Sequence, residues 1–569
     1  MNSKMINLKA NPFFLDDEAI AWVNRTLSEM TVEEKVGQLF CVLFKEGKPE
    51  EFDYVYSILK PGGCMYRVIP TERAVAASQA LQARSKIPLL IAANLEKGGN
   101  GIVKEGTLVG APMEIAATDD TEMAAKMAQA CAEEAKAVGA NWAFAPIIDI
   151  DTNFRNPITN TRTFGSDPER VTRMGKAYVE RVQALGLAAS IKHFPGDGQD
   201  ERDQHLVTSI NSMDCETWMN TYGKAYQTSI DAGALTCMVG HIMQPAWTRA
   251  LNPEIRDEDI MPGTLSPELL QGVLRGKLGF NGMICTDATT MAGYMLAMSR
   301  RRAVPECIAR GCDMFLFARN LSEDYGFMLD GVRDGTITLE RLDEAVTRIL
   351  ATKAALGLHK GVPAISVEKA GEIVGCPTHH AWADECADRA ITLVKEQQGV
   401  LPITPERYKR ILFYTIEPPA GGEGAYQVKS ACGKVKELLE KEGFEVDEFV
   451  PQPYGEGFTA KYMDFVDKYD LILYVANLTT KSNQTVVRIE WRQPMGADCG
   501  HYINDIPTVF VSLENPYHLL DFPRVKTYIN CYSNNDHCIR QLIEKLTGRS
   551  EFKGKSPVDA FCGKWDTHL

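Results

Sequence analysis

Short apolar runs alternate along the first 320 residues with longer segments in which apolar positions recur at helical spacing. The runs suit buried strands, and segments such as 121–138 and 171–185 suit amphipathic helices. Eight such strand–helix units, ending with a helix over 339–356, predict a TIM-type (β/α)8 barrel with insertions. The expected strands are 36–43, 63–66, 89–94, 142–145, 188–193, 235–240, 283–287 and 313–317.

Polar side chains lie at or just after the ends of five of these runs, where barrel enzymes collect their catalytic groups. A single Asp or Asn in such a place can instead cap the next helix, so each residue alone is weak evidence. Taken together they predict an active site at this face of the barrel. The residues are Asn94, Asp149, Lys192 with His193, His241 and Asp287.

Residues 192–206 place several basic side chains and several carboxylates in one loop that begins at the end of an apolar strand. A solvated acidic loop with satisfied histidines is the alternative, and it suits Asp200 and Glu201. Pro195 and the neighbouring glycines restrict the backbone of this polar segment, which favours an active-site loop.

A second domain is expected after the barrel. Gly and Pro residues over 357–363 mark a connection, so we divide the chain into a barrel over 1–360, a linker over 361–380 and a second domain over 381–569. Apolar runs at 410–414, 471–475, 508–512 and 527–531, with a helix at 435–442, predict a smaller α/β domain. It has no Gly-x-Gly-x-x-Gly motif or phosphate loop, which argues against a nucleotide site.

Composition narrows the class of protein. Apolar residues at 45% and charged residues at 24% are ordinary for a globular protein, and the length of 569 residues requires more than one core. The net charge of -14 argues against nucleic acid as a partner. The sequence does not indicate an oligomeric state.

The chain shows no signal peptide and no apolar stretch of membrane-spanning length, so we expect a cytoplasmic protein without a membrane partner. The fifteen cysteines are an odd number scattered through apolar segments, which indicates reduced, buried thiols. There is no Cys-x-x-Cys or His-x-x-x-His pair, and a structural zinc site is not expected.

Several motifs together resemble glycoside hydrolase family 3, and specifically its β-N-acetylglucosaminidase branch. The second domain resembles the α/β sandwich that many members add. The resemblance implies a retaining, exo-acting enzyme that releases terminal β-linked N-acetylglucosamine from small soluble glycosides without metal or organic cofactor. The matching segments are 30–39, 144–150, 162–168, 192–196, 265–267 and 279–287.

The resemblance also implies residue roles. Asp287 is the expected nucleophile, which forms a covalent glycosyl-enzyme. His205 is the expected general acid/base, and Asp203 orients its ring and favours its cationic form. Cap formation by Asp287 is the alternative. The expected substrate-binding residues are Lys192, His193, Arg162, Asn94 and His241, the last of which could also lie behind the site.

The sequence departs from the family pattern in three places. The segment 94–100 begins with Asn94 where the family has an acid, contains an additional lysine and lacks the arginines. Asp197 replaces a histidine, and Gln204 replaces the serine of the acid/base motif. These changes leave the nucleophile and the acid/base in place, but they leave open which sugar the enzyme prefers.

Three alternatives therefore stay open. The enzyme could be a β-glucosidase or a member of mixed specificity. It could use phosphate instead of water, because a histidine acid becomes neutral after donating its proton and does not repel an incoming anion. It could also be an inactive carbohydrate-binding protein, although such a protein has no chemical reason to keep both Asp287 and His205.

Overall fold

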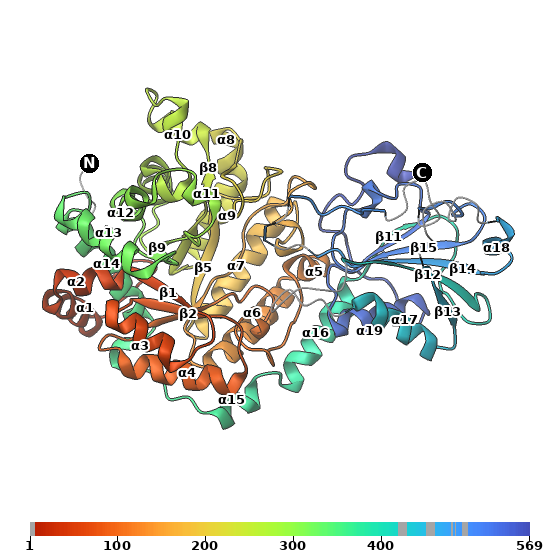
Figure 1. The fold of residues 1–569 in the computed structure, drawn as a ribbon, viewed down its shortest axis with the longest axis horizontal. Coiled ribbons are helices and arrows are strands. Elements are labelled where there is room, and N and C mark those ends of the chain that lie inside the picture. Colours follow the sequence, from red (N-terminus) through yellow and green to blue (C-terminus); the bar gives the residue numbers. More distant parts are fainter. Residues whose placement is uncertain (1–5, 419–429, 451–460, 480–481, 484, 492–498) are drawn as a thin grey trace. The chain divides into compact units, whose positions relative to one another are not determined.

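The structure is a computed structural model that describes residues 6–418, 430–450, 461–479, 482–483, 485–491 and 499–569. It contains two compact units (Figure 1). The first unit comprises 1–109, 124–156 and 168–380, and the second comprises 110–123, 157–167 and 381–569. No sequence pattern had indicated that the short segments 110–123 and 157–167 group with the second unit.

The first unit is built on eight parallel strands in the order β10-β1-β2-β3-β4-β5-β7-β9. An isolated parallel bridge between Cys285 and Met314 joins β9 to β10 and completes the barrel. The prediction of a (β/α)8 barrel is confirmed. The strands are β1 (Phe40–Phe44), β2 (Gly63–Tyr66), β3 (Leu90–Ala93), β4 (Trp142–Ala143), β5 (Ala188–Phe194), β7 (Thr236–Val239), β9 (Met283–Thr286) and β10 (Phe315–Leu316).

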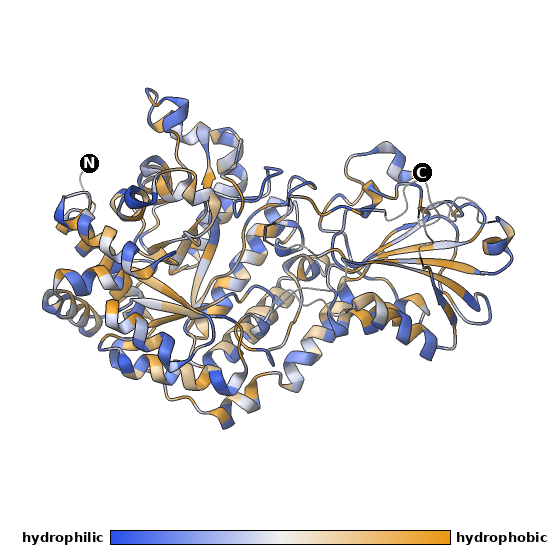
Figure 2. Cartoon of the chain, in the orientation of Figure 1, coloured by the Kyte–Doolittle hydropathy of each residue, from blue (hydrophilic) through white to orange (hydrophobic). Residues whose placement is uncertain are grey.

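Helices surround these strands (Figure 1). Their apolar faces pack inward, and the strands carry mainly hydrophobic residues (Figure 2). The main helices are α1 (Asp17–Glu29), α2 (Val32–Gln38), α3 (Pro49–Ile58), α4 (Thr71–Arg84), α6 (Thr121–Ala137), α7 (Pro168–Ala184), α9 (Lys224–Asp231), α12 (Arg300–Arg310), α13 (Leu321–Arg333) and α14 (Leu339–Ala355). The shorter helices are α8 (Cys215–Trp218), α10 (Pro245–Leu251) and α11 (Ala292–Met295), and η3 (Met219–Gly223) and η6 (Glu268–Lys277) are π-helical.

The prediction that the first strand begins at Val36 is wrong. Val36 lies in α2, and β1 begins only at Phe40. A capping box starts this helix, because the Thr31 hydroxyl accepts the Glu34 N–H and the Glu34 carboxylate accepts the Thr31 N–H. The buried Val36 side chain belongs to the inner face of a helix rather than to a strand, a difference that a short apolar run does not reveal.

The second unit contains a six-stranded sheet in the order β11-β16-β15-β14-β12-β13. Its strands are β11 (Thr392–Glu396), β12 (Arg410–Ile416), β13 (Glu445–Glu448), β14 (Leu471–Ala476), β15 (Thr508–Ser512) and β16 (Thr527–Asn530), and only β11 pairs antiparallel. The sequence predicted four of these strands but not β11 or β13. Strand β13 is mostly acidic and lies at the sheet edge, so it shows no apolar run.

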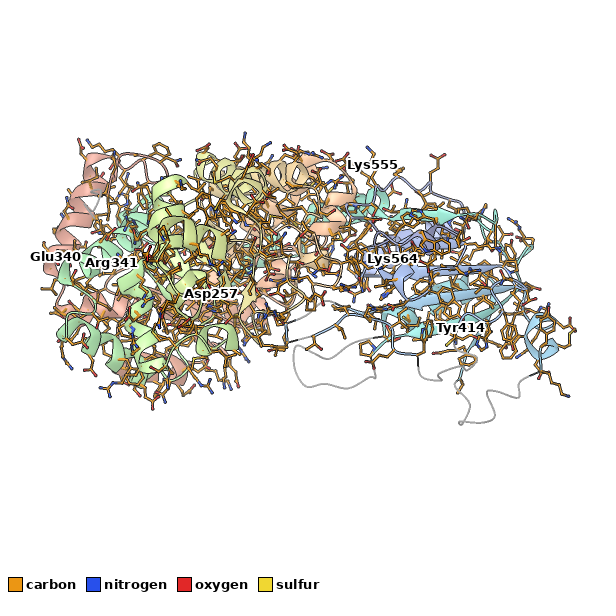
Figure 3. The ribbon with its side chains drawn as sticks, turned by 90° about the horizontal axis from the view of Figure 1, so that it is seen from above. Asp257, Glu340, Arg341, Tyr414, Lys555 and Lys564 are labelled. Carbon is orange, nitrogen blue, oxygen red and sulfur yellow. The ribbon has the colours of Figure 1, made fainter. Side chains whose placement is uncertain are left out.

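Helices cover this smaller sheet, and one of its faces is rich in aromatic rings. Tyr414, which is labelled in Figure 3, stacks on Tyr474 with a centroid distance of 4.3 Å. The connection expected at 361–380 contains α15 (Val367–Ile373) and the start of α16 (Pro377–Ala390). The remaining helices are α5 (Pro112–Ala117), α17 (Ala431–Lys441), α18 (Met463–Val466) and α19 (Asp536–Leu546).

Candidate active site

The carboxylate of Asp149 organises the loop that follows β5. Its Oδ1 atom accepts the backbone N–H groups of His193, at 3.1 Å, and Asp197, at 2.8 Å. The loop also passes close to other backbone, because a Cβ atom on Gly198 would lie 1.9 Å from the Ile150 carbonyl oxygen. Gly198 has a φ of +107°, so both its conformation and its surroundings require glycine.

His193 stands between two carboxylates. Its Nδ1 atom lies 2.7 Å from Asp149 Oδ2, and its Nε2 atom lies 3.9 Å from Asp287 Oδ2. The Asp149 contact fixes the ring plane and directs Nε2 toward the expected nucleophile. The structure thus brings together Asp149 from the segment after β4, His193 near the end of β5 and Asp287 directly after β9, as expected for groups at the strand ends of one barrel.

Lys192 forms a buried ion pair that the sequence analysis did not identify. Its Nζ atom lies 2.7 Å from Glu96 Oε1, and its side chain is only 3% exposed. Glu96 belongs to the segment 94–100 that departs from the family pattern, and the nearby Asn94 is exposed. A cation held in this way cannot swing away from the mouth of the barrel, which suits a group that binds sugar hydroxyls.

Replacing Glu96 with glutamine should raise KM about tenfold with a smaller effect on kcat, because Lys192 loses its charged partner. Steady-state kinetics on an aryl β-glycoside measures both constants. Glu201→Gln is the matched control, since it breaks the exposed ion pair with Arg155, and exposed pairs contribute little. Equal effects of the two substitutions would contradict a role for Glu96 in holding Lys192.

His205 and Asp203 form the dyad that the sequence predicted. His205 Nδ1 lies 2.6 Å from Asp203 Oδ1, and the same oxygen accepts the His205 backbone N–H at 2.9 Å. The Asp203 side chain is fully buried, whereas the His205 side chain is 23% exposed. The ring is therefore anchored on its inner nitrogen and leaves the outer nitrogen for a reactant.

Several contacts hold this dyad loop in place. Asp200 accepts the Ile210 N–H at 2.8 Å and forms an ion pair with Arg202. The short strand β6 (Ser209–Ile210) pairs with β8 (Ile242–Met243), which ties the loop to the segment after β7. Asp200 thus has a structural task in the loop, and with a side chain only 11% exposed it differs from the solvated carboxylate that the alternative expected.

The dyad loop is also bonded to the loop that follows Asp287. The N–H of Ala292 donates to the His205 carbonyl at 3.0 Å, and the N–H of Gly293 donates to the Gln204 carbonyl at 3.1 Å. A Cβ atom on Gly293 would lie 2.6 Å from that Gln204 oxygen, so only glycine permits this approach. The two loops form one hydrogen-bonded pair, which we call the loop clamp.

Asp287 directly follows β9, and its side chain is 14% exposed. Burial opposes its charged form, but His193, His241 and His205 more than compensate, so the pKa of Asp287 lies below its usual value. Its Oδ1 atom accepts the Ala288 N–H at 2.7 Å. The carboxylate is anionic at neutral pH, the state that a nucleophile requires.

His241 is completely buried and interacts electrostatically with Asp287. Its Nδ1 atom lies 3.0 Å from Thr264 Oγ1, and its Nε2 atom lies 3.0 Å from the Ala288 carbonyl oxygen. Since a carbonyl only accepts, Nε2 carries the proton, and burial lowers the pKa of His241. These contacts favour the alternative that His241 supports the nucleophile from behind, while sugar binding by His241 stays a prediction.

Arg162 ends the 3-10 turn η2 (Asn160–Arg162), in a segment that belongs to the second unit. Its role in sugar binding stays a prediction. No group of three or more His, Cys, Asp or Glu side chains suited to a metal ion is present among the residues that the structure describes. Within the same ranges, no helix has eighteen consecutive residues as apolar as a membrane span requires.

Comparison with known proteins places this site in a family. A model of the glycosyl hydrolase family 3 N terminal domain matches residues 31–352. The chain belongs to glycosyl hydrolase family 3. A family relative named beta-N-acetylglucosaminidase/beta-glucosidase, from Cellulomonas fimi, is 52% identical over 565 residues, which cover 99% of this chain and 100% of the relative.

Two solved structures extend the comparison. A beta-glucoside phosphorylase named BglX is 47% identical, with a TM-score of 0.92 over 98% of this chain and 99% of that chain. A family 3 beta-N-acetylglucosaminidase from Paenibacillus sp. str. FPU-7 is 25% identical, with a TM-score of 0.79 over 94% of this chain and 100% of that chain. The family 3 architecture of a barrel followed by a smaller α/β domain is therefore shared over nearly the whole chain.

Proposed function

We propose that this family 3 enzyme is a retaining, exo-acting β-N-acetylglucosaminidase that acts on small soluble glycosides. The proposal rests on one observation above all. The loop clamp joins the segment that follows Asp287, whose carboxylate is anionic, to the loop that carries the Asp203–His205 dyad. A nucleophile and a proton donor held on adjoining loops are the two groups that a double displacement needs.

In the first step, an Asp287 oxygen bonds to the anomeric carbon while the bond to the leaving oxygen breaks. His205, as an imidazolium, transfers its outer N–H proton to that oxygen, and an alcohol departs. Asp203 stays anionic and stabilises the cationic ring. The products are a covalent glycosyl–Asp287 ester and a neutral His205.

In the second step, neutral His205 removes a proton from water as the water oxygen attacks the anomeric carbon. The ester bond to Asp287 breaks, and the sugar leaves with its original β configuration after two inversions. Lys192 and His193 hold the sugar hydroxyls in this proposal, and their contacts with Glu96 and Asp149 keep both side chains in place.

Phosphate is a second acceptor that the chemistry supports. After the first step the acid/base is an uncharged ring, so an incoming phosphate meets no carboxylate at this position. An attacking phosphate oxygen would yield a glycosyl phosphate and free Asp287. The name of the beta-glucoside phosphorylase that is 47% identical to this chain favours this alternative, and it also favours glucose as a sugar.

One assay distinguishes these possibilities. Aryl β-glycosides of N-acetylglucosamine and of glucose are incubated with the enzyme, each with and without inorganic phosphate, and products are followed by NMR. We expect turnover of the N-acetylglucosaminide with a β-configured first product. Faster turnover of the glucoside would instead establish a β-glucosidase, and a sugar phosphate as main product would establish a phosphorylase.

Replacing Asp203 with asparagine should move the alkaline limb of the pH–rate profile to lower pH, because the imidazolium loses the charge that stabilises it. The imidazolium is the form that donates the proton. Substrates with poor leaving groups should be affected most. The measurement is kcat/KM against pH on aryl glycosides of graded leaving-group acidity.

Asp200→Asn serves as the control for this prediction, since Asp200 lies in the same loop and pairs with Arg202 instead of a histidine. It should leave the alkaline limb where it is. A uniform loss of activity in Asp203→Asn, with an unmoved limb, would make Asp203 a purely structural residue.

We also propose a cytoplasmic location for the enzyme. All fifteen cysteines are free thiols, and most are buried in the cores of the two units. Reduced thiols in this number are usual in proteins that remain in a reducing compartment. Detection of the protein in a cytosolic fraction by immunoblotting tests this part of the proposal.

A further inference from the structure

Asp197 is a buried carboxylic group beside the active site that the mechanism above does not use. It replaces the second histidine of the family motif and is only 3% exposed. Its Oδ1 atom accepts the Gly198 N–H at 2.7 Å and the Asn156 side-chain amide at 3.0 Å. Its backbone N–H donates to Asp149, which places two buried carboxylic groups next to each other.

The surroundings of Asp197 supply no compensating cation. Among the described residues, Asp197 forms no ion pair with a lysine or an arginine. The titratable groups near it are Asp149 from the segment after β4, Asp203 of its own loop, and two buried phenols, Tyr222 of η3 and Tyr226 of α9. The Tyr222 hydroxyl donates to the Asp197 carbonyl at 2.6 Å, and burial raises the pKa of this phenol well above its usual value, so it is neutral.

Two adjacent buried carboxylic groups do not ionise together, because each anion raises the energy of the other. The contacts decide which group keeps the proton. Each of the two groups accepts two amide N–H donors, but Asp149 in addition faces the His193 ring, whose Nδ1 atom lies 2.7 Å from Asp149 Oδ2. Charge is therefore better stabilised on Asp149.

We propose that Asp197 is a positioning residue that works as a neutral carboxylic acid, so that Asp149 alone carries the negative charge facing His193. In this state the repulsion between the two groups is absent, and the loop holds the His193 ring with Nε2 directed toward Asp287. Ionisation of Asp197 places a second anion in the same buried space and disturbs that loop. The catalytic part of this inference rests on the proposed function.

The pKa of Asp197 agrees with this geometry. Burial and then the charge of Asp149 raise it from 3.8 to about 8. Between these two values the folded protein keeps a proton that the unfolded chain has released. Stability of the wild type therefore falls as pH rises through this window, and the loss is complete above the folded pKa.

The first test compares the thermal stability of the wild type and Asp197→Asn. Asparagine has the size of the neutral acid and no proton to lose. The Tm of the variant relative to the wild type should rise steadily from about pH 5 to about pH 8 and then level off. A purely structural role for Asp197 would give a Tm difference that does not change with pH.

The second test measures kcat/KM against pH for an activated aryl glycoside, whose leaving group needs little help from His205. The wild type should lose activity above about pH 8 as Asp197 ionises. In Asp197→Asn the alkaline limb of the pH–rate profile should lie at least about one pH unit higher. Glu201→Gln provides the matched control, because Glu201 lies in the same loop but forms only an exposed ion pair with Arg155, and its profile should follow the wild type.

A pH-independent Tm difference, or an unmoved alkaline limb in an active enzyme, overturns the proposal. If the wild type turned over none of the glycosides, the proposed function would be refuted instead. The Tm comparison would still decide whether Asp197 is protonated in the folded protein. If Asp197→Asn does not fold, infrared spectroscopy of the wild type decides. A protonated-carboxyl band should persist at about pH 6.5 and fade by about pH 9, and its absence overturns the proposal.

Discussion

Asp287→Asn is expected to lower kcat/KM for every β-glycoside by at least about 10³-fold, because the amide cannot form the glycosyl ester. Circular dichroism should show an unchanged fold, since the backbone N–H of residue 287 still donates to the Val239 carbonyl. The measurement is steady-state turnover with aryl glycosides that have good leaving groups, where the contribution of the acid is smallest.

Asp257→Asn is the matched control for this substitution, because Asp257 lies on the surface with a side chain that is 82% exposed (Figure 3). It should retain wild-type activity. Turnover of Asp287→Asn near that of the wild type would remove Asp287 from the mechanism. Loss of turnover in this variant alone would also exclude an inactive carbohydrate-binding protein.

His205→Ala should separate substrates by their leaving groups. Glycosides with poor leaving groups need the proton and should lose about 10²- to 10⁴-fold in kcat/KM, whereas activated aryl glycosides should lose much less. The measurement is kcat/KM across a series of aryl glycosides of graded acidity. The slope of the logarithm of kcat/KM against leaving-group pKa should steepen in the variant.

Equal losses across the series would show that His205 does not protonate the leaving group. The control is His241→Gln, because His241 is buried and its ring contacts Thr264 and Ala288. This substitution should affect all substrates alike, since it disturbs the support of the nucleophile and not the proton donor.

The barrel could be predicted because parallel strands buried on both faces appear as continuous apolar runs. Strand β3 is the clearest case, since all four of its residues are apolar and buried. Prediction of strands from apolar runs fails where such a run belongs to a helix, as at Val36. It also fails where a strand is exposed and acidic, as in β13. Burial, rather than secondary structure as such, is what the pattern reports.

The candidate site was predicted as a set of residues but not as a set of contacts. Local spacing was enough for the Asp203–His205 dyad, because its members are two residues apart. The ion pair of Lys192 with Glu96 joins residues 96 positions apart, and nothing in the pattern of either segment marks the other. Long-range partners of this kind depend on strand order and register, which the structure supplies.

The loop clamp also bears on attempts to redesign this enzyme. The carbonyl groups of Gln204 and His205 accept hydrogen bonds from the N–H groups of Gly293 and Ala292. The loop that carries His205 and the segment that follows Asp287 are therefore hydrogen-bonded to each other through their backbones. A grafted acid/base loop from another enzyme would have to present its carbonyl groups at the same places. Chimeric enzymes should therefore exchange both loops as a single cassette, since either loop alone would leave its partner's donors or acceptors unmatched.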